Sequence, residues 1–98
     1  MILIAHRINR LKELKSIPIK YGIELDIRDY QKHLILQHDP FKKGEKFKNL
    51  IDNFKHRFII LNIKSENIEF EVLKLLKKKK IIKLFFFRLF FSHDTKFN

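Results

Sequence analysis

Residues 22–28 read GIELDIR, a stretch in which aliphatic and charged side chains alternate strictly. A period of two is that of a β-strand, whose successive side chains point to opposite faces. The aliphatic residues therefore share one face, and Glu24 and Asp26 share the other. Two carboxylates on the inner face of a buried strand repel each other, and a cation between them relieves that repulsion. Oxygen ligands of this kind suit magnesium or calcium.

The sequence on both sides of this strand alternates between strand-like and helix-like patterns. Short apolar or alternating runs predict strands at 2–5, 34–37, 58–64 and 81–87. Apolar residues at helical spacing predict helices over 8–14, 47–54 and 68–76, with Pro18 closing the first and Asn67 as the N-cap of the last. This alternation of strands and helices predicts parallel strands joined by crossover helices, and hence an α/β fold.

Length and composition set the outer limits. The chain has 98 residues, enough for one small domain, and its hydrophobic content of 45% is that of a globular protein. A formal net charge of +11 favours phosphate-bearing partners, nucleic acid or anionic membrane surfaces, although a solvated basic surface is the more usual explanation of such a charge. The absence of cysteine excludes disulfides, thiolate zinc sites and cysteine nucleophiles.

No part of the sequence predicts a membrane span or a signal peptide. The apolar start, residues 1–5, is too short for a signal-peptide core. The longest apolar candidate, residues 81–91, is interrupted by Lys83 and Arg88. The expected location is therefore the cytoplasm.

Three short polar groups fall at or near the carboxyl ends of expected strands, where parallel α/β folds build their active sites. These groups are His6-Arg7, Glu24 with Asp26, and His38-Asp39. Taken singly, each has an ordinary explanation: a structural histidine, or the exposed face of an antiparallel strand. Their occurrence in order at successive strand ends favours a common site. His33, His56 and His93 are assigned no role, the last because it falls in a polar tail.

The residue types in these groups suit phosphate chemistry. Histidine as a residue type is suited to proton transfer near neutral pH, so His6 and His38 suit a general base and a general acid on either side of a phosphate. Arg7 is always charged and its planar fork suits a bidentate phosphate contact. Lys64 shares a strand face with Asn62 and offers a further positive charge for a phosphoryl transition state.

The segments IAHR at 4–7, GIELDI at 22–27 and LQHD at 36–39 together resemble the HR…E-x-D…HD signature of glycerophosphodiester phosphodiesterases. These enzymes belong to the wider group of phosphodiesterases similar to phosphatidylinositol phospholipase C. The resemblance is close over roughly the first forty residues, and the order of elements continues to about residue 87. It implies a (β/α)8 barrel and metal-dependent hydrolysis of glycerophosphodiesters to an alcohol and glycerol 3-phosphate.

The resemblance also implies a role for each matching residue. His6 and His38 become the acid/base pair, Arg7 and Lys64 phosphate contacts, and Glu24 and Asp26 ligands of magnesium or calcium. One position departs from the pattern: Asn62 stands where the family's E-x-K motif has another metal-binding glutamate. A neutral amide holds a cation less tightly than a carboxylate, so we expect the activity to be impaired or lost.

The resemblance also predicts an incomplete barrel. About three and a half βα units are present where the fold needs eight, so a truncated or frame-shifted reading frame is expected. Residues 1–91 then form a partial barrel, and residues 92–98 a polar tail. The apolar run 81–91 would be an open edge through which the chain self-associates.

A non-catalytic module is the alternative. Lys77–Lys80 and the phenylalanines that follow would then form a basic and aromatic patch for an anionic membrane surface or nucleic acid. The lysines fit a helix end better, where cations suit the macrodipole. No nucleic-acid fold signature accompanies them, so no specific nucleic-acid partner is expected, whereas peripheral membrane contact remains open.

Overall fold

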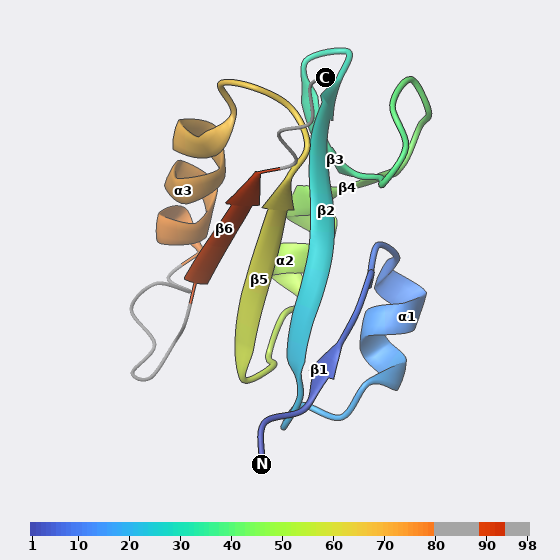
Figure 1. The fold of residues 1–98 in the computed structure, drawn as a ribbon, viewed down its shortest axis with the longest axis vertical. Helices are drawn as coiled ribbons and strands as arrows, with labels where there is room; N and C mark the ends of the chain where they lie inside the picture. Colours follow the sequence, from blue (N-terminus) through green and yellow to red (C-terminus); the bar gives the residue numbers. More distant parts are fainter. Residues whose placement is uncertain (80–88, 94–98) are drawn as a thin grey trace.

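The computed structural model describes residues 1–79 and 89–93, which form a mixed α/β fold (Figure 1). The elements follow in the order β1 (Ile4–Ala5), α1 (Leu11–Ser16), β2 (Gly22–Tyr30), β3 (His33–Leu36), β4 (Glu45–Lys46), α2 (Phe47–Asp52), β5 (Phe58–Ile63), α3 (Glu69–Lys78) and β6 (Leu89–His93). The α/β class predicted from the sequence is confirmed.

The strand β2 organises the sheet because it pairs with three other strands. On one edge it pairs in parallel with β5 from Gly22 to Ile27, and β5 pairs in parallel with β6. On the other edge of β2, β1 pairs in parallel with the first two residues of β2, Gly22 and Ile23. On that same edge β3 pairs with β2 in antiparallel fashion from Ile27 onward. Residues 24–26 of β2 therefore have no strand partner on that second edge, and the gap lies between the ends of β1 and β3 (Figure 1).

The expectation of parallel strands throughout is wrong at β3 and β4. A hairpin connects β2 to β3, and its two turn residues, Gln31 and Lys32, have φ angles of 50° and 68°. Positive φ at both central residues is the geometry of a type I′ turn, which matches the twist of the flanking strands. That turn is ordinarily signalled by Asn-Gly or Asp-Gly, and Gln-Lys gives no such signal.

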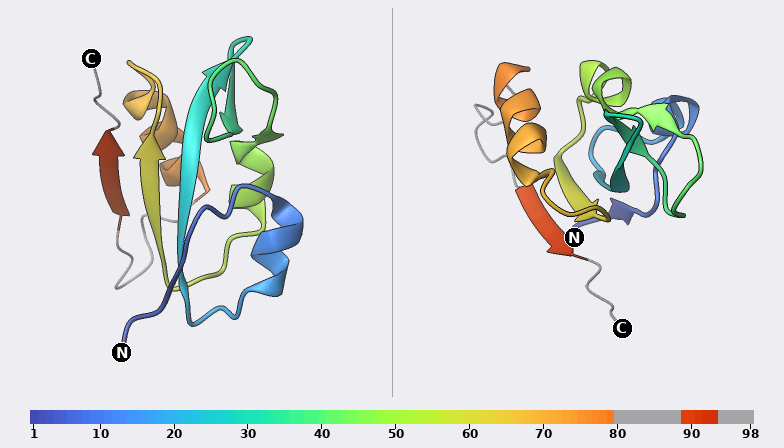
Figure 2. Two further views of the ribbon diagram at one scale, coloured as in Figure 1. Left: turned by 45° about the vertical axis from the view of Figure 1, so that its right-hand side comes forward. Right: turned by 90° about the horizontal axis from the view of Figure 1, so that it is seen from above.

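The core lies between one face of the sheet and the three helices. Seen from above in Figure 2, the helices all stand on the same side of the sheet. Ile23, Leu25 and Ile27 of β2 are fully buried there, with the alternate aliphatic residues of β5 beside them. The helices contribute the buried side chains predicted from their spacing: Leu14 from α1; Phe47, Leu50 and Ile51 from α2; Val72 and Leu76 from α3. Glu24, Asp26, Asn62 and Lys64 consequently lie on the helix-free face.

Two boundaries differ from the sequence prediction. Asn67 is not the N-cap of α3: its φ is 63°, the cap position belongs to Ile68, and no side chain caps the helix. Ser92 and His93 are not part of a tail, because they complete β6, where Ser92 is in register with Asn62. The predicted strand 81–87 and most of the apolar run 81–91 lie outside the described residues. Among the described helices, none is long and apolar enough to cross a membrane.

An ion pair links α2 to the end of α3, and it predicts how stability depends on pH. A hydrogen bond from Lys79, helped by Lys48 at 3.6 Å, lowers the pKa of Asp52 below its usual 3.8. A carboxyl group with a lowered pKa stabilises the fold above its unfolded pKa, and the contribution is lost as the pH falls through the folded value. We expect Asp52→Asn to flatten the loss of unfolding free energy below about pH 4. Urea unfolding at stepped pH measures this, and an unchanged slope against wild type would contradict it. Asp29→Asn, an exposed carboxylate in β2, is the control.

Candidate functional site

The gap in the second edge of β2 is where two predicted motifs meet. After β1 ends, the chain turns back so that the amide of Ile8 donates to the carbonyl of Glu24 at 2.8 Å. After β3 ends, the amide of Gln37 donates to the carbonyl of Asp26 at 3.1 Å. The segments that contain His6-Arg7 and His38 therefore leave the sheet on either side of the two carboxylates. The structure brings together the three groups that the sequence singled out.

Glu24 is paired with His6. Nδ1 of the imidazole lies 2.9 Å from Oε1 of the carboxylate, and the His6 side chain is 69% exposed. Partial burial acts to raise the pKa of Glu24, but hydrogen bonds from His6 and Asn62 and the charge of His6 outweigh it and lower the pKa below 4.5. Glu24 is therefore ionised at neutral pH and holds the imidazole by one nitrogen, which leaves Nε2 available for chemistry.

Asp26 is the most deeply buried charged residue among those described, at 1% exposure. Asn9 makes two hydrogen bonds with Asp26. Its side-chain nitrogen donates to Oδ2 of the carboxylate at 3.0 Å, and its side-chain oxygen accepts from the backbone amide of Asp26 at 2.9 Å. Asn62 lies 3.5 Å and Lys64 3.8 Å from Oδ1. Protein donors thus satisfy this carboxylate, whereas the sequence argument relied on a cation alone. Asn62 acts on both acids, which makes them one site.

Arg7, His38 and Asp39 form a second, adjoining chain of contacts. A guanidinium nitrogen of Arg7 donates to Nε2 of His38 at 3.0 Å, and Nδ1 of His38 lies 3.0 Å from Oδ1 of Asp39. The hydrogen bond with His38 is the largest cause of a lowered pKa at Asp39. Arg7 has a φ of 53°, a left-handed conformation that costs a non-glycine residue about 1–2 kcal/mol. Strained backbone of this kind gathers at functional sites.

Two residues that the sequence analysis left out hold the site together. Arg28 donates to the carbonyl of His38 at 2.7 Å and to the carbonyl of Lys64 at 3.4 Å, so it ties the segment after β3 to the end of β5. Asn9 ties the segment after β1 to Asp26. Arg28 had a sequence signal, because it continues the alternation of Glu24 and Asp26 on one face of the strand. Asn9 had none beyond its closeness to His6-Arg7.

A hollow of about 580 Å³ opens beside Arg7 and His38, between the segment after β1 and the segment that joins β3 to β4. Arg10 and Lys43 line it further out, together with Glu13 and Glu45. Its volume is that of a small-molecule site. Glu24 and Asp26 lie outside its lining, so a ligand in the hollow meets the site from the side of Arg7 and His38.

The donor atoms suit a hard divalent cation only in part. Within residues 1–79 and 89–93, no three His, Cys, Asp or Glu side chains gather closely enough to form a metal group. Among the described side chains, the oxygens on the helix-free face include the carboxylates of Glu24 and Asp26 and the side-chain carbonyl of Asn62, although both oxygens of Asp26 already have protein partners. They are of the kind that magnesium and calcium accept, but they carry one charge fewer than a set of three carboxylates.

Comparison of the chain with models of known families, with curated proteins and with solved structures finds no match to any of them. The chemistry of the site therefore has to be argued from its own residues. The resemblance of residues 4–7, 22–27 and 36–39 to glycerophosphodiester phosphodiesterases also bears on that chemistry.

Proposed function

We propose that the fold is the N-terminal part of a (β/α)8 barrel. The support is the order of the parallel strands, β1, β2, β5 and β6, which neighbour one another in the order in which they occur in the chain. Helices cover one face, and the polar residues lie on the other, as on the inside of a barrel at its active end. In this interpretation β3 and β4 are a hairpin inserted after the second barrel strand.

The function proposed for the site is metal-dependent hydrolysis of phosphodiesters, with glycerophosphodiesters as substrates and glycerol 3-phosphate as a product. The observation that supports it most is the convergence of His6, Arg7 and His38 on the gap in β2 beside Glu24 and Asp26. Two histidines, an arginine and two carboxylates around this gap are the groups that an acid/base attack on a phosphate needs.

Each side chain has a distinct task in this proposal. Glu24 fixes His6 through Nδ1, so that Nε2 accepts a proton from the attacking water. His38 accepts a hydrogen bond from Arg7 at Nε2, so in this arrangement that nitrogen carries no proton. When Arg7 turns to the phosphate, Nε2 is free to take up a proton and deliver it to the leaving alcohol.

Three positively charged groups would neutralise the negative charge on the phosphate. Arg7 offers a bidentate contact on one side, and Lys64 a point charge on the other. A magnesium or calcium ion held by Glu24 and Asp26 would supply Lewis-acid charge to a phosphoryl oxygen. Because Asn62 brings no negative charge, we expect the ion to be held weakly and turnover to be slow.

Assay of the folded chain with glycerophosphocholine tests the proposal. We expect release of glycerol 3-phosphate that requires magnesium or calcium and stops on chelation. His6→Ala is expected to lower the rate by about 10²-fold or more, since general acid–base catalysis contributes that much. Asp29→Asn, on the same strand as Glu24 but on the other face, is expected to retain the rate. No activity from a folded wild-type chain, or equal loss in both variants, would overturn the proposal.

The remaining partner predictions rest largely on residues 80–91, most of which lie outside the described part of the chain. Peripheral membrane contact and self-association through residues 81–91 therefore stay predictions. The competing patch formed by Lys77–Lys80 and the phenylalanines stays a prediction for the same reason.

A further inference from the structure

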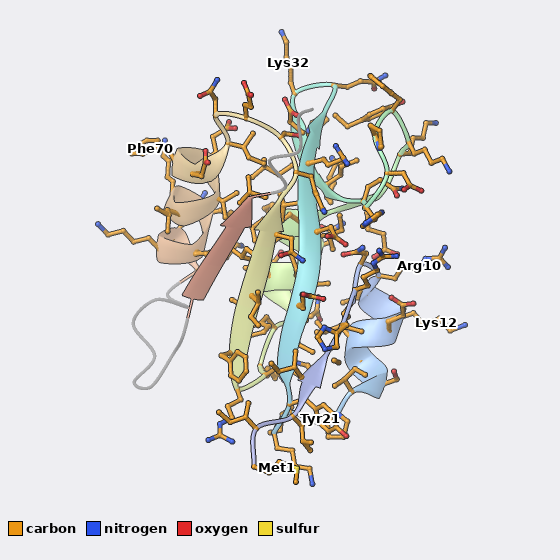
Figure 3. All side chains as sticks on the ribbon, viewed as in Figure 1. Met1, Arg10, Lys12, Tyr21, Lys32 and Phe70 are labelled. Atoms are coloured by element: carbon orange, nitrogen blue, oxygen red, sulfur yellow. The ribbon has the colours of Figure 1, made fainter. Side chains whose placement is uncertain are left out.

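A second hollow, remote from the diesterase site, lies between α3 and the β3–β4 hairpin and has a volume of about 420 Å³. Its floor is apolar, formed by Leu34 of β3 and Leu75 of α3. Five lysines surround it: Lys32, Lys46, Lys48, Lys74 and Lys78. We refer to this feature as the lysine groove. In Figure 3, Lys32 extends from the tip of the β2–β3 hairpin.

The sequence gives little sign of this groove because the lysines come from three separate stretches of the chain. Lys32 lies in the hairpin turn, Lys46 in β4 and Lys48 in α2. Lys74 and Lys78 are four residues apart, so they share one face of α3. Folding gathers charges that are scattered along the chain, and like charges gathered at one hollow cost free energy unless an anion joins them.

The charges in the groove are poorly balanced by the protein itself. Glu71 is the acidic residue in its lining, against five lysines. Lys48 pairs with Asp52 at 3.6 Å, whereas in the part of the chain that the structure describes the other four lysines make no ion pair. These four lysines are exposed, so they are accessible to a ligand.

We propose that the lysine groove binds a group carrying two or more phosphates. Lysine ammonium groups act as point charges that suit phosphate oxygens, whereas recognition of planar carboxylates favours arginine, and none of the described residues that line the groove is an arginine. Among the described residues its lining holds no phenylalanine, tyrosine or tryptophan, and His33 alone offers a ring for base stacking, which disfavours a single nucleic-acid strand that stacks successive bases. The volume fits a small polyphosphate or one lipid headgroup.

Titration of the folded chain with inorganic tripolyphosphate, followed by calorimetry, tests the proposal. We expect Lys46→Gln/Lys74→Gln to weaken binding about tenfold or more, because two facing charges are removed. The control Lys12→Gln/Lys20→Gln removes the same net charge away from the groove, and α1 with Lys12 lies across the molecule from α3 (Figure 3). It is expected to change affinity by less than about twofold.

Glu71→Gln gives a test in the opposite direction. Glu71 is the one acidic residue among the described residues that line the groove, and its removal is expected to tighten binding of tripolyphosphate by a few-fold. Tighter binding after loss of a carboxylate is not the result of damage to the fold, so this variant separates recognition from instability. Unchanged or weaker binding by Glu71→Gln would count against the groove as the binding site.

Two sources of the phosphate group are separated by vesicles. Preferential binding to vesicles containing phosphatidylinositol 4,5-bisphosphate, over phosphatidylserine vesicles of equal charge, supports a lipid headgroup. Binding to tripolyphosphate without that preference supports a free ligand. The proposal would be overturned if the chain bound neither tripolyphosphate nor the phosphoinositide vesicles, or if the groove and control variants lost affinity equally. It would also be overturned if the groove lysines mattered only for binding to oligouridylate.

Discussion

Replacement of Lys64 by methionine is expected to lower the free energy of unfolding by about 3 kcal/mol, because it leaves a buried carboxylate without its cation. Lys64 lies 3.8 Å from Oδ1 of Asp26, and the two side chains are 12% and 2% exposed. Methionine keeps most of the volume and removes the charge. Asn9 and Asn62 still donate to the carboxylate, but neutral amides do not replace a positive charge. Urea denaturation at neutral pH measures the effect.

Two further variants decide whether the loss comes from the charge on Asp26. Lys64→Met/Asp26→Asn is expected to recover much of the stability, since the uncompensated charge is gone. Lys42→Met, at an exposed lysine, is expected to change stability by less than about 0.5 kcal/mol. A loss in Lys64→Met that the second substitution does not reduce would contradict this explanation.

Phe47→Ala is expected to cost about 3–5 kcal/mol, the usual loss for a buried aromatic ring. Phe47 is the first residue of α2 and is fully buried in the core. Removal of its ring leaves a cavity between the helix and the sheet. Phe41 provides a matched control only six residues away, because it is 94% exposed. Thermal and urea unfolding of both variants should show a large loss for the first and almost none for the second; similar losses would place the core elsewhere.

The sequence was most informative where burial imposes a period. The alternation in GIELDIR identified both the strand and its two faces, because one face of β2 meets three helices. The spacing of Phe47, Leu50 and Ile51 identified α2 for the same reason. The type I′ hairpin was not predicted because Gln31 and Lys32 both have positive φ angles, which these residue types rarely adopt. That turn reverses the chain, so β3 runs antiparallel, and the sheet is mixed.

The residues of the candidate site could be predicted from the sequence, but the contacts between them could not. His6, Glu24, Asp26 and His38 were found because they are polar residues within or directly after expected strands, although Glu24 and Asp26 lie inside β2 and not at its end. The sequence could not show that Asn9 and Lys64 would satisfy Asp26, since those residues lie 17 and 38 positions away from it. Contacts over such separations depend on which strands are neighbours.

The central claim is that Glu24 and Asp26 hold a divalent cation for phosphodiester chemistry. Calorimetric titration of the folded chain with magnesium and with calcium tests it most directly. The account predicts saturable binding of one of the two ions, weakened about tenfold or more by Glu24→Gln, since a charged ligand is lost. It also predicts no change in Asp29→Asn. Absence of binding to wild type, or equal binding by wild type and Glu24→Gln, would contradict it.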